Sequence, residues 1–539
     1  MPDADAASRT VAEALLADLA QRGTRRIWGV PGGGSSLDVI AATPRHGIDF
    51  ILARQEANAA MMALADAELT GAPGVVMTTK GPGVSNAANG LACAMLERAP
   101  LMLLSDGFTA SQLGYVTHQV FDQQAATAAI AKGYSRAEGD APAEDIAALL
   151  DLAQAAPRGA VHLDLTGQAA RRTALPMAPR ATAEAAALPI GDAAALLAKA
   201  KRPVILAGVE AAEPVAAAAL RRLAEALGCP VLVTYKAKGV LPDRHPLYAG
   251  LFTGGSLEAP CVGAADCIIQ AGLDPVELIL QPWRYAAPIL DIALRPHPVR
   301  YAVPQAALHG DLGASLASLL RVAGPSGWGL AEIARLRADA LAALEWNGQG
   351  GVSPPDIVRL AQQEARDAGR APRASVDAGA HMFSATAFWQ CEHPRDLLIS
   401  NGLASMGFAL PAGIAAALHD PARGAVAFTG DGGLMMCIGE LATAAQTGAR
   451  LVTVVFNDSA LSLIDIKQQQ RQLAPAGVAF APTDFATVAE GFGVAGFRAD
   501  TPENYRKALR AAFAVEGPSL VDVRVNPAGY PAQLQAMRG

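Results

Sequence analysis

Short apolar runs alternate with longer Ala-rich stretches, in which apolar residues recur at helical spacing, along most of the chain. Apolar runs of four to eight residues that alternate with helical stretches are typical of β–α–β units, whose parallel strands are buried between helices. The pattern therefore predicts an α/β protein with doubly wound parallel sheets. We expect strands at residues 25–30, 74–79, 101–106, 160–165, 203–208, 230–235, 267–272, 397–400, 425–430, 451–456 and 519–525.

Two stretches interrupt this alternation and predict domain boundaries. Residues 170–189 are rich in Pro, Ala and Arg and have little apolar periodicity. Gly- and Pro-rich segments at 323–329 and 345–355 bracket a single helical segment. A chain of 539 residues has room for about three or four domains. We expect three α/β domains, at residues 1–178, 186–325 and 350–539.

Composition and charge narrow the functional class. The chain is 52% hydrophobic and 17% charged, which is typical of a folded globular protein. Its net charge is −7 and it has no Lys/Arg run, so we expect no nucleic-acid partner. No apolar run approaches the roughly 20 residues that span a bilayer, so we expect no membrane contact. The N-terminus has no signal-peptide pattern, and six scattered cysteines without a CxxC pair indicate reduced thiols, which together predict a cytoplasmic enzyme.

Polar residues end two neighbouring strands in the last third of the chain. Asp431 follows the strand at 425–430, and Asn457 ends the strand at 451–456. The stretch between them has apolar residues at helical spacing and ends at Gly448, so the unit reads as β–α–β with both strands ending at one edge of the sheet. Carboxylate and amide oxygens suit Mg²⁺. The sequence therefore indicates a magnesium site with Asp431 and Asn457 as ligands.

Gly432 and Gly433 follow the aspartate and lead into this helix. The free N–H groups at a helix N-terminus favour an anion, so a metal–phosphate complex is expected here. No GxxxxGK[ST] motif occurs, which excludes a Walker loop. Alone, the "GDGG" segment is equally well explained as a turn with a capping aspartate, and Asn457 shifts the interpretation towards metal and phosphate binding.

The "GDG" segment, followed after 24 residues by "ND", resembles the signature of thiamine-diphosphate-dependent enzymes of the acetolactate synthase and benzoylformate (2-oxo acid) decarboxylase superfamily. Three N-terminal segments, "GVPGGGSSLDV" (29–39), "ARQEANAAMM" (53–62) and "TTKGPGVSN" (78–86), are similar to the family pattern in order and spacing. The resemblance implies pyrimidine-binding, central and diphosphate-binding domains, with thiamine diphosphate and Mg²⁺ as cofactors. "GPGVSN" lacks the third glycine of a dinucleotide fingerprint, which argues against a nicotinamide site.

The resemblance also implies roles for individual residues. Glu56 would hydrogen-bond the aminopyrimidine ring of the cofactor and promote the C2 ylide, although a lone helix-end glutamate is more often solvated. Met406 would lie under the bent cofactor, and the backbone carbonyl of Ser459 would complete the Mg²⁺ shell. A core methionine is the alternative for Met406, and a surface histidine after a strand is the alternative for His381. The other cofactor-binding positions implied are Pro31, Gly32, Gly81, Asn86, Ala380, His381, Gly402, Gly430, Gly432, Gly433, Ala460 and Leu461.

Substrate choice depends on positions where the chain departs from acetolactate synthases. His118 and Gln119 stand where those enzymes have an aromatic residue followed by Gln, and Lys467 stands in place of a substrate-selecting tryptophan. We expect His118, Gln119 and Lys467 to handle proton transfer and orientation, with a loop histidine and a solvated lysine as the alternatives. Lys80 and Lys467 near a pocket mouth would suit a carboxylated substrate. Residues 270–283 lack the arginine-bearing loop of flavin-containing synthases, which argues against FAD.

The resemblance implies a decarboxylase or carboligase that acts on a 2-oxo acid through a C2 ylide and an enamine. A hydrolase or acyltransferase acting on a diketone or sulfonated aldehyde, and a non-catalytic cofactor-binding homologue, are the alternatives. In this family the positions of Glu56 and Asp431 meet across a subunit interface. The resemblance thus implies a homodimer at least, usually paired again as a homotetramer.

Overall fold

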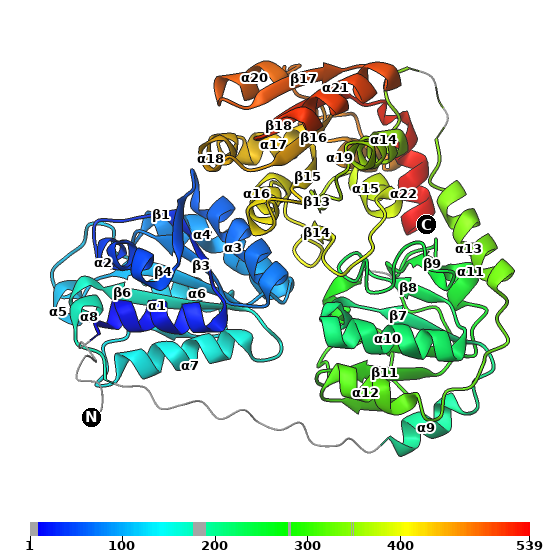
Figure 1. Ribbon diagram of the computed structural model, residues 1–539, viewed down its shortest axis with the longest axis horizontal. Helices are drawn as coiled ribbons and strands as arrows, with labels where there is room; N and C mark the ends of the chain where they lie inside the picture. The colour runs from blue at the N-terminus through cyan, green and yellow to red at the C-terminus, as the bar shows by residue number, and fades with distance from the viewer. Residues whose placement is uncertain (1–8, 176–189, 279–281, 347, 349) are drawn as a thin grey trace.

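The computed structural model describes residues 9–175, 190–278, 282–346, 348 and 350–539. It contains three six-stranded sheets, and every strand pair in them is parallel. Figure 1 shows the three domains that these sheets form, with helices on both faces of each sheet. The predicted α/β class and doubly wound parallel sheets are therefore confirmed. The predicted end of the first domain and start of the second, residues 178 and 186, lie outside the described residues.

The N-terminal sheet has the strand order β2-β1-β3-β4-β6-β5. Its strands β1, β3, β4 and β6 are the four that the apolar pattern predicts. The strands are β1 (Arg26–Val30), β2 (Asp49–Leu52), β3 (Gly74–Thr78), β4 (Leu101–Gly107), β5 (Tyr134–Ser135) and β6 (Ala160–Thr166). The helices are α1 (Val11–Arg22), α2 (Ser35–Ala42), α3 (Glu56–Thr70), α4 (Pro82–Leu96), α5 (Ala110–Leu113), α6 (Gln123–Thr127), α7 (Pro142–Gln154) and α8 (Gly167–Arg171), with a 3₁₀ turn η1 (Thr43–His46).

The central sheet has the order β12-β11-β10-β7-β8-β9, in which the strand order reverses between β7 and β10. This is the strand order of dinucleotide-binding folds. The strands are β7 (Pro203–Ala207), β8 (Val231–Val233), β9 (Tyr248–Leu251), β10 (Cys267–Ala271), β11 (Ile289–Ala293) and β12 (Ala306–His309). The helical elements are α9 (Gly191–Leu197), η2 (Val209–Ala212), α10 (Pro214–Leu227), α11 (Ala259–Val262), η3 (Pro275–Glu277), α12 (Leu312–Leu319) and α13 (Leu330–Ala342), the helix expected between the two Gly/Pro-rich segments.

The C-terminal sheet has the order β14-β13-β15-β16-β18-β17, which repeats the order of the N-terminal sheet. Its strands are β13 (Arg373–Val376), β14 (Leu397–Ile399), β15 (Ala425–Gly430), β16 (Leu451–Asn457), β17 (Ala495–Ala499) and β18 (Ser519–Arg524). The helical elements are α14 (Pro354–Asp367), α15 (Met382–Phe388), α16 (Ala409–His419), α17 (Asp431–Cys437), α18 (Glu440–Thr447), α19 (Ser462–Gln470), α20 (Phe485–Gly491), α21 (Pro502–Ala514), η4 (Pro527–Gly529) and α22 (Tyr530–Arg538).

The crossover between β15 and β16 differs from the expectation in one respect. The sequence predicts one helix there, whereas the structure has two, α17 and α18, separated by a turn at Ile438 and Gly439. At this turn the chain passes close to the N-terminal domain, because a Cβ on Gly439 would lie 3.5 Å from the Cβ of Arg54. Glycine has a low helix propensity, which favours an interruption of the helix at this position. Helix α18 begins directly after this turn, beside the N-terminal domain.

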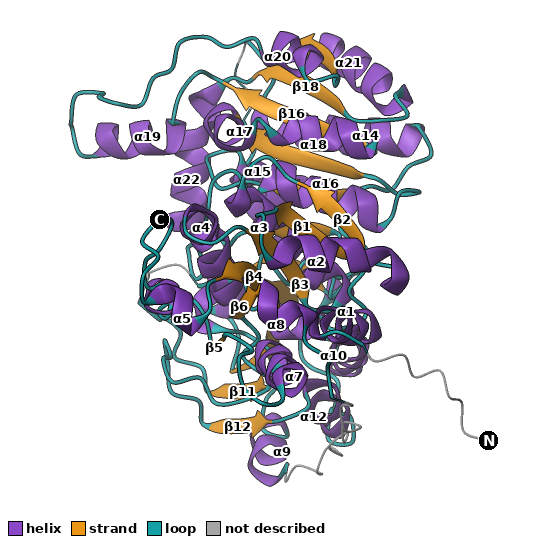
Figure 2. Ribbon diagram, turned by 90° about the vertical axis from the view of Figure 1, so that its left-hand side faces the viewer, coloured by secondary structure: helices purple, strands orange, loops and turns teal. Residues whose placement is uncertain are grey.

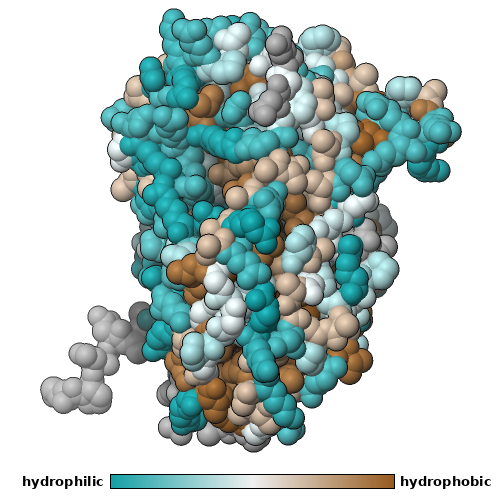
Figure 3. Space-filling model, turned by 90° about the vertical axis from the view of Figure 1, so that its right-hand side faces the viewer, coloured by the Kyte–Doolittle hydropathy of each residue, from teal (hydrophilic) through white to brown (hydrophobic). Residues whose placement is uncertain are grey.

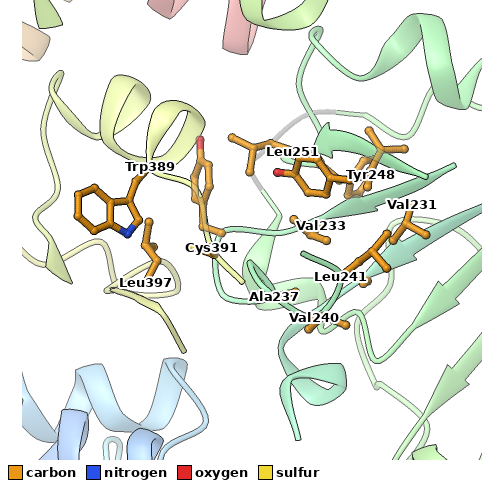
Figure 4. Close-up of a cluster of buried hydrophobic side chains, with 14 of the residues drawn as sticks. Val231, Val233, Ala237, Val240, Leu241, Tyr248, Leu251, Trp389, Cys391 and Leu397 are labelled. Atoms are coloured by element: carbon orange, nitrogen blue, oxygen red, sulfur yellow. The ribbon is translucent and has the colours of Figure 1, made fainter. Parts of the chain in front are cut away.

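Hydrophobic packing joins the C-terminal domain to both of its neighbours. One buried cluster includes α3 and α4 of the N-terminal domain and α16 of the C-terminal domain. A second runs from the central sheet into the C-terminal domain, where Trp389 and Leu397 lie on the side facing β8 and β9 (Figure 4). The chain therefore holds its three domains in one arrangement through continuous apolar contacts.

Surface and thiol chemistry complete the description. No helix in the described part of the chain is long and apolar enough to cross a membrane. On the face in Figure 3 hydrophilic residues predominate and apolar residues form small groups. All six cysteines are buried free thiols.

Candidate functional site

The three predicted metal ligands lie together at the carboxyl edge of the C-terminal sheet. Strands β15 and β16 pair in parallel along their full lengths, so Asp431 and Asn457 end up side by side. Asp431 Oδ2 accepts a hydrogen bond from the backbone N–H of Ser459 (2.6 Å), and the Ser459 hydroxyl donates to Asn457 Oδ1 (3.4 Å). The amide nitrogen of Asn457 donates to Asp522 Oδ1 (2.8 Å), which turns its oxygen towards Ser459.

Electrostatics at this edge fit a divalent cation. Asp431 is 4% exposed, and its burial together with the neighbouring Asp458 raises its pKa to about 6. Burial also raises the pKa of Asp458, and neither carboxylate has a cation among its described neighbours. A bound Mg²⁺ would remove this cost because it favours both charged carboxylates. The described residues contain no cluster of three or more His, Cys, Asp or Glu, which is consistent with a site built from one carboxylate, one amide and one carbonyl.

A cavity of about 390 Å³ opens beside these ligands. The carboxyl edge of the C-terminal sheet forms most of its wall, and residues 276–278 of the central domain contribute to the rest. Cavities of this size hold small organic ligands. Ten of the residues predicted to bind cofactor or metal line it: Ala380, His381, Gly402, Met406, Gly430, Asp431, Gly432, Gly433, Ala460 and Leu461.

His381 lines this cavity as a neutral ring. It is 4% exposed, and burial lowers its pKa to about 4. The ring packs against Phe456 with 5.2 Å between centroids, and its Nε2 atom is buried with no hydrogen-bond partner in the described structure. An unpaired buried nitrogen costs about 1–3 kcal/mol, and packing against Phe456 and a hydrogen bond with the backbone of Phe428 hold the ring in place.

The glycines around the cavity are required by contacts within the protein. A Cβ on Gly433 would lie 2.2 Å from Asp377 Oδ2, and one on Gly402 would lie 2.6 Å from the carbonyl oxygen of Leu96. A Cβ on Gly432 would meet Leu461 at 2.8 Å. Gly432 and Gly433, which the sequence predicts at a ligand, therefore also have a steric reason within the protein.

The predicted residues of the N-terminal domain form a separate group. Glu56 is the first residue of α3, and its Oε2 accepts a hydrogen bond from the side-chain nitrogen of Asn86 (3.0 Å). Pro31 and Gly32 follow β1, and the N–H of Gly81, after β3, donates to Gln123 Oε1 (2.6 Å). None of these residues lines the cavity beside Asp431. The predicted residues therefore fall into two groups at the carboxyl edges of two sheets with the same strand order. We call them the N-terminal half-site (Pro31, Gly32, Glu56, Gly81 and Asn86) and the C-terminal half-site (the predicted residues beside Asp431).

The residues predicted to select the substrate are not all brought together. His118 is exposed and does not line the cavity beside Asp431. It also does not line a second cavity, in the N-terminal domain, to which Gln119 contributes. Gln119 is exposed in a left-handed conformation (φ 59°) and lines that second cavity together with Lys80. Lys467 is exposed on α19, at the periphery of the domain (Figure 2), and does not line the cavity beside Asp431, although Ile464 of the same helix does. The structure thus groups Gln119 with Lys80 and not with Lys467.

Three buried acids that organise the half-sites were missed by the sequence analysis. Asp377 accepts hydrogen bonds from the backbone of Gly407 and Phe408, which fixes the loop after Met406. Asp106 binds the start of α2 through the backbone N–H groups of residues 34 and 36. Asp377 and Asp106 each lie at the end of an apolar strand, as Asp431 does. That position is the sequence signal that could have revealed these two acids.

Glu440, the third of these acids, connects the two half-sites within one chain. It lies fully buried at the start of α18, and its Oε1 accepts hydrogen bonds from the backbone N–H groups of Arg54 and Gln55 (both 3.1 Å) and from the side chain of Asn58 (3.3 Å). These three residues surround Glu56 at the start of α3. A carboxylate of the C-terminal domain therefore positions the helix that carries Glu56.

Comparison with known proteins decides the family. Three family models match along the chain: "Thiamine pyrophosphate enzyme, N-terminal TPP binding domain" at residues 9–130, "central domain" at 190–319 and "C-terminal TPP binding domain" at 377–523. The chain is 30% identical to the acetolactate synthase of Bacillus subtilis over 96% of its own length and 93% of that protein. The chain belongs to the thiamine pyrophosphate enzymes. This confirms the superfamily inferred from the "GDG" and "ND" segments.

Other thiamine pyrophosphate enzymes that resemble the chain differ in reaction. A catabolic acetolactate synthase of Raoultella terrigena is 30% identical, over 96% of each protein. A probable 2-ketoarginine decarboxylase of Pseudomonas aeruginosa is also 30% identical, over 96% of the chain and 94% of that protein. The chain is accordingly a thiamine-pyrophosphate-dependent, acetolactate-synthase-like enzyme. Since a synthase and a decarboxylase lie at equal identity, likeness alone does not choose between their reactions.

Proposed function

We propose that this enzyme uses thiamine diphosphate and Mg²⁺ to decarboxylate a 2-oxo acid, and that it releases the product as an aldehyde or joins it to a second carbonyl compound. The observation that carries the proposal is the convergence of Asp431, Asn457 and Ser459 beside a cavity lined by the residues predicted to bind the cofactor. Thiamine diphosphate, when bound, supplies a carbon nucleophile and an electron sink for the loss of CO₂.

The chain's own residues would divide the work. The carboxylates of Asp431 and Asp458, which have no cationic partner among the described residues, would favour Mg²⁺ binding at this edge of the sheet. The bound Mg²⁺ would in turn neutralise a diphosphate. Glu56 has one oxygen engaged by Asn86, and its Oε1 makes no hydrogen bond within the described residues. That oxygen is free to hold a proton against the aminopyrimidine ring, as the family resemblance predicts. Met406, in the wall of the same cavity, would support the bent cofactor.

A second copy of the chain would complete the site. In the single chain Glu56 and Asp431 belong to different half-sites, and apolar side chains near both half-sites are exposed. Exposed apolar side chains gain from burial against a partner surface. We therefore propose a homodimer, in which each active site takes Glu56 from one protomer and Asp431 from its partner, with a tetramer formed by two such pairs. The exposed residues are Leu113, Tyr115 and Phe121 near the N-terminal half-site and Met435, Met436, Ile464, Leu473 and Phe480 near the C-terminal one.

We further infer that the central domain does not take FAD. A nucleotide would bind at the carboxyl edge between β7 and β10, where the strand order reverses. At this point Glu277 Oε2 accepts a hydrogen bond from the N–H of Val209 (2.8 Å), and a Cβ on Gly208 would lie 2.6 Å from the same oxygen. Thr234 donates to the other oxygen (2.5 Å). The carboxylate thus occupies the N–H group that a phosphate would use.

The test is product analysis with a panel of 2-oxo acids, supplied with thiamine diphosphate and Mg²⁺. We expect CO₂ release with an aldehyde or 2-hydroxyketone product, and we expect Glu56→Gln to bind cofactor normally while losing most of this activity. Carbon–carbon cleavage of a diketone or sulfonated aldehyde without CO₂ release would favour a hydrolase or acyltransferase. Cofactor binding without any turnover would favour a non-catalytic homologue. A flavin absorption band in the purified protein would contradict the inference about Glu277.

A further inference from the structure

A second cavity, of about 460 Å³, lies in the N-terminal domain beside Gln119. Lys80, Phe108, Tyr134 and Arg136 contribute to its wall. It adjoins the predicted cofactor-binding loop, because a Cβ on Gly81 would lie 2.8 Å from the carbonyl oxygen of Gln119. A predicted catalytic residue and two cations therefore share one cavity at the edge of the N-terminal half-site.

The two cations have unused binding capacity. The ammonium group of Lys80 lies 4.8 Å from the centroid of the Phe108 ring and makes no hydrogen bond or ion pair within the described residues. Arg136 donates from Nη2 to the carbonyl oxygen of Phe108 and to Glu138 Oε1 (3.3 Å). Its Nε is buried without a partner. A buried donor left unpaired is costly, and a bound anion would satisfy it.

The carboxylates in the wall are engaged by groups other than these cations. Asp164 accepts hydrogen bonds from Gln123 (2.7 Å) and Ser105 at Oδ1 and from the hydroxyl of Tyr134 (2.6 Å) at Oδ2, and its Oδ1 also lies 3.0 Å from His162 Nε2. Asp122 caps α6 by accepting from the N–H of residue 125 (2.8 Å). Neither forms an ion pair with Lys80 or Arg136 within the described residues. Lys80 therefore faces the cavity without an acidic partner among the described residues, whereas Arg136 is ion-paired with Glu138 (3.3 Å) and keeps only its Nε unpaired.

We propose that this cavity is the subsite for a carboxylate that the substrate keeps through the reaction, bound by Lys80 with support from Arg136. The inference rests on the proposed 2-oxo acid chemistry. A cation on the carboxylate that leaves as neutral CO₂ would stabilise the ground state more than the transition state. The carboxylate bound here is accordingly a second one, either on the side chain of a diacid donor or on a 2-oxo acid acceptor. Both sources present the same anion to Lys80.

The experiment compares carboxylated and uncharged substrates in the holoenzyme. Donors are 2-oxoglutarate and 2-oxopentanoate, and acceptors are pyruvate and acetaldehyde. We expect Lys80→Met to lower kcat/KM at least about tenfold, or about 1.4 kcal/mol, for the carboxylated member of one pair, chiefly through KM. The uncharged member should change less than about twofold, and Lys80→Arg should restore the difference. Whichever pair responds identifies the source of the carboxylate.

Lys507→Met is the matched control, because Lys507 is exposed on α21 in the C-terminal domain and does not line either cavity. Equal losses for charged and uncharged substrates in Lys80→Met, or no loss, would overturn the subsite. Absence of product from every 2-oxo acid would instead refute the proposed function. In that case titration calorimetry with glutarate, a non-reacting dicarboxylate, decides the matter. Binding to the wild type and about tenfold weaker binding to Lys80→Met supports the subsite, and equal or absent binding refutes it.

Discussion

Replacing Glu440 by Ala should release the start of α3 without touching either half-site directly. The carboxylate accepts hydrogen bonds from the N–H groups of Arg54 and Gln55, and both contacts are only part-buried. Leaving each N–H without its partner costs about 1–2 kcal/mol, because water can replace part of the bond, so the pair costs about 2–4 kcal/mol. Thr443 also donates to the carboxylate (2.6 Å) and would lose an acceptor.

Hydrogen exchange measures this loss where it occurs. If residues 53–58 open locally, about 2–4 kcal/mol corresponds to roughly 30- to 900-fold faster amide exchange in that segment. Since Glu56 lies within it, the activity of the Ala variant should fall together with the protection. Glu440→Gln is the matched control, because its amide oxygen can keep the Oε1 bonds to Arg54, Gln55 and Asn58 while the Thr443 hydroxyl turns to accept. It loses only the longer contact from the N–H of Arg54 to Oε2 (3.3 Å). Unchanged exchange in the Ala variant, or equal acceleration in the Gln variant, would refute the positioning role.

Two further outcomes follow from the metal edge and from the buried acid of the central domain. Asp431→Ala should weaken Mg²⁺-dependent binding of thiamine diphosphate by at least about 100-fold, since even indirect partners of a metal contribute about 10- to 100-fold. Quenching of the intrinsic fluorescence measures this binding. Glu503→Ala on α21 is the control, and unchanged affinity in Asp431→Ala would refute the metal assignment. Burial raises the pKa of Glu277 from 4.5 to about 8, so its stabilising contribution is full below about pH 4.5 and is lost as the pH rises through 8. The free energy of unfolding of the wild type relative to Glu277→Gln should therefore fall between pH 6 and 8.5, by up to about 1.4 kcal/mol per pH unit. The melting temperatures of the two proteins report this change, and a constant difference between them would contradict it.

The parts of the fold that the sequence predicted are those with a strong local signal. Interior strands such as β3 and β4 are continuous apolar runs, because both of their faces are covered by helices. Five of the strands that were not predicted, β2, β5, β9, β12 and β17, are sheet edges. Edge strands are short and partly exposed, as in β2, whose four residues include no fully buried one. Their apolar pattern is too weak to separate them from loops.

The residues of the candidate site also divide into those that the sequence could place and those that it could not. Asp431 and Asn457 could be placed from the sequence because a parallel crossover brings both strand ends to one edge. Lys467 could not be placed from the sequence, because a match to a family position does not give the direction of a side chain on α19. In the structure this side chain is exposed. The role of Glu440 was also out of reach, since its partners lie 382 to 386 positions earlier in the chain.

The sequence by itself determined the α/β class, the strand ends that carry the predicted metal ligands and the enzyme family, because each depends on residues that are close together in the chain or on a motif of fixed spacing. Only the tertiary structure decided which of these residues meet. It separated Glu56 from Asp431 into two half-sites, placed Lys80 and Gln119 in one cavity, and joined the half-sites through Glu440. The physical reason is that such contacts arise from the packing of whole domains, which no local pattern of apolar and polar residues specifies.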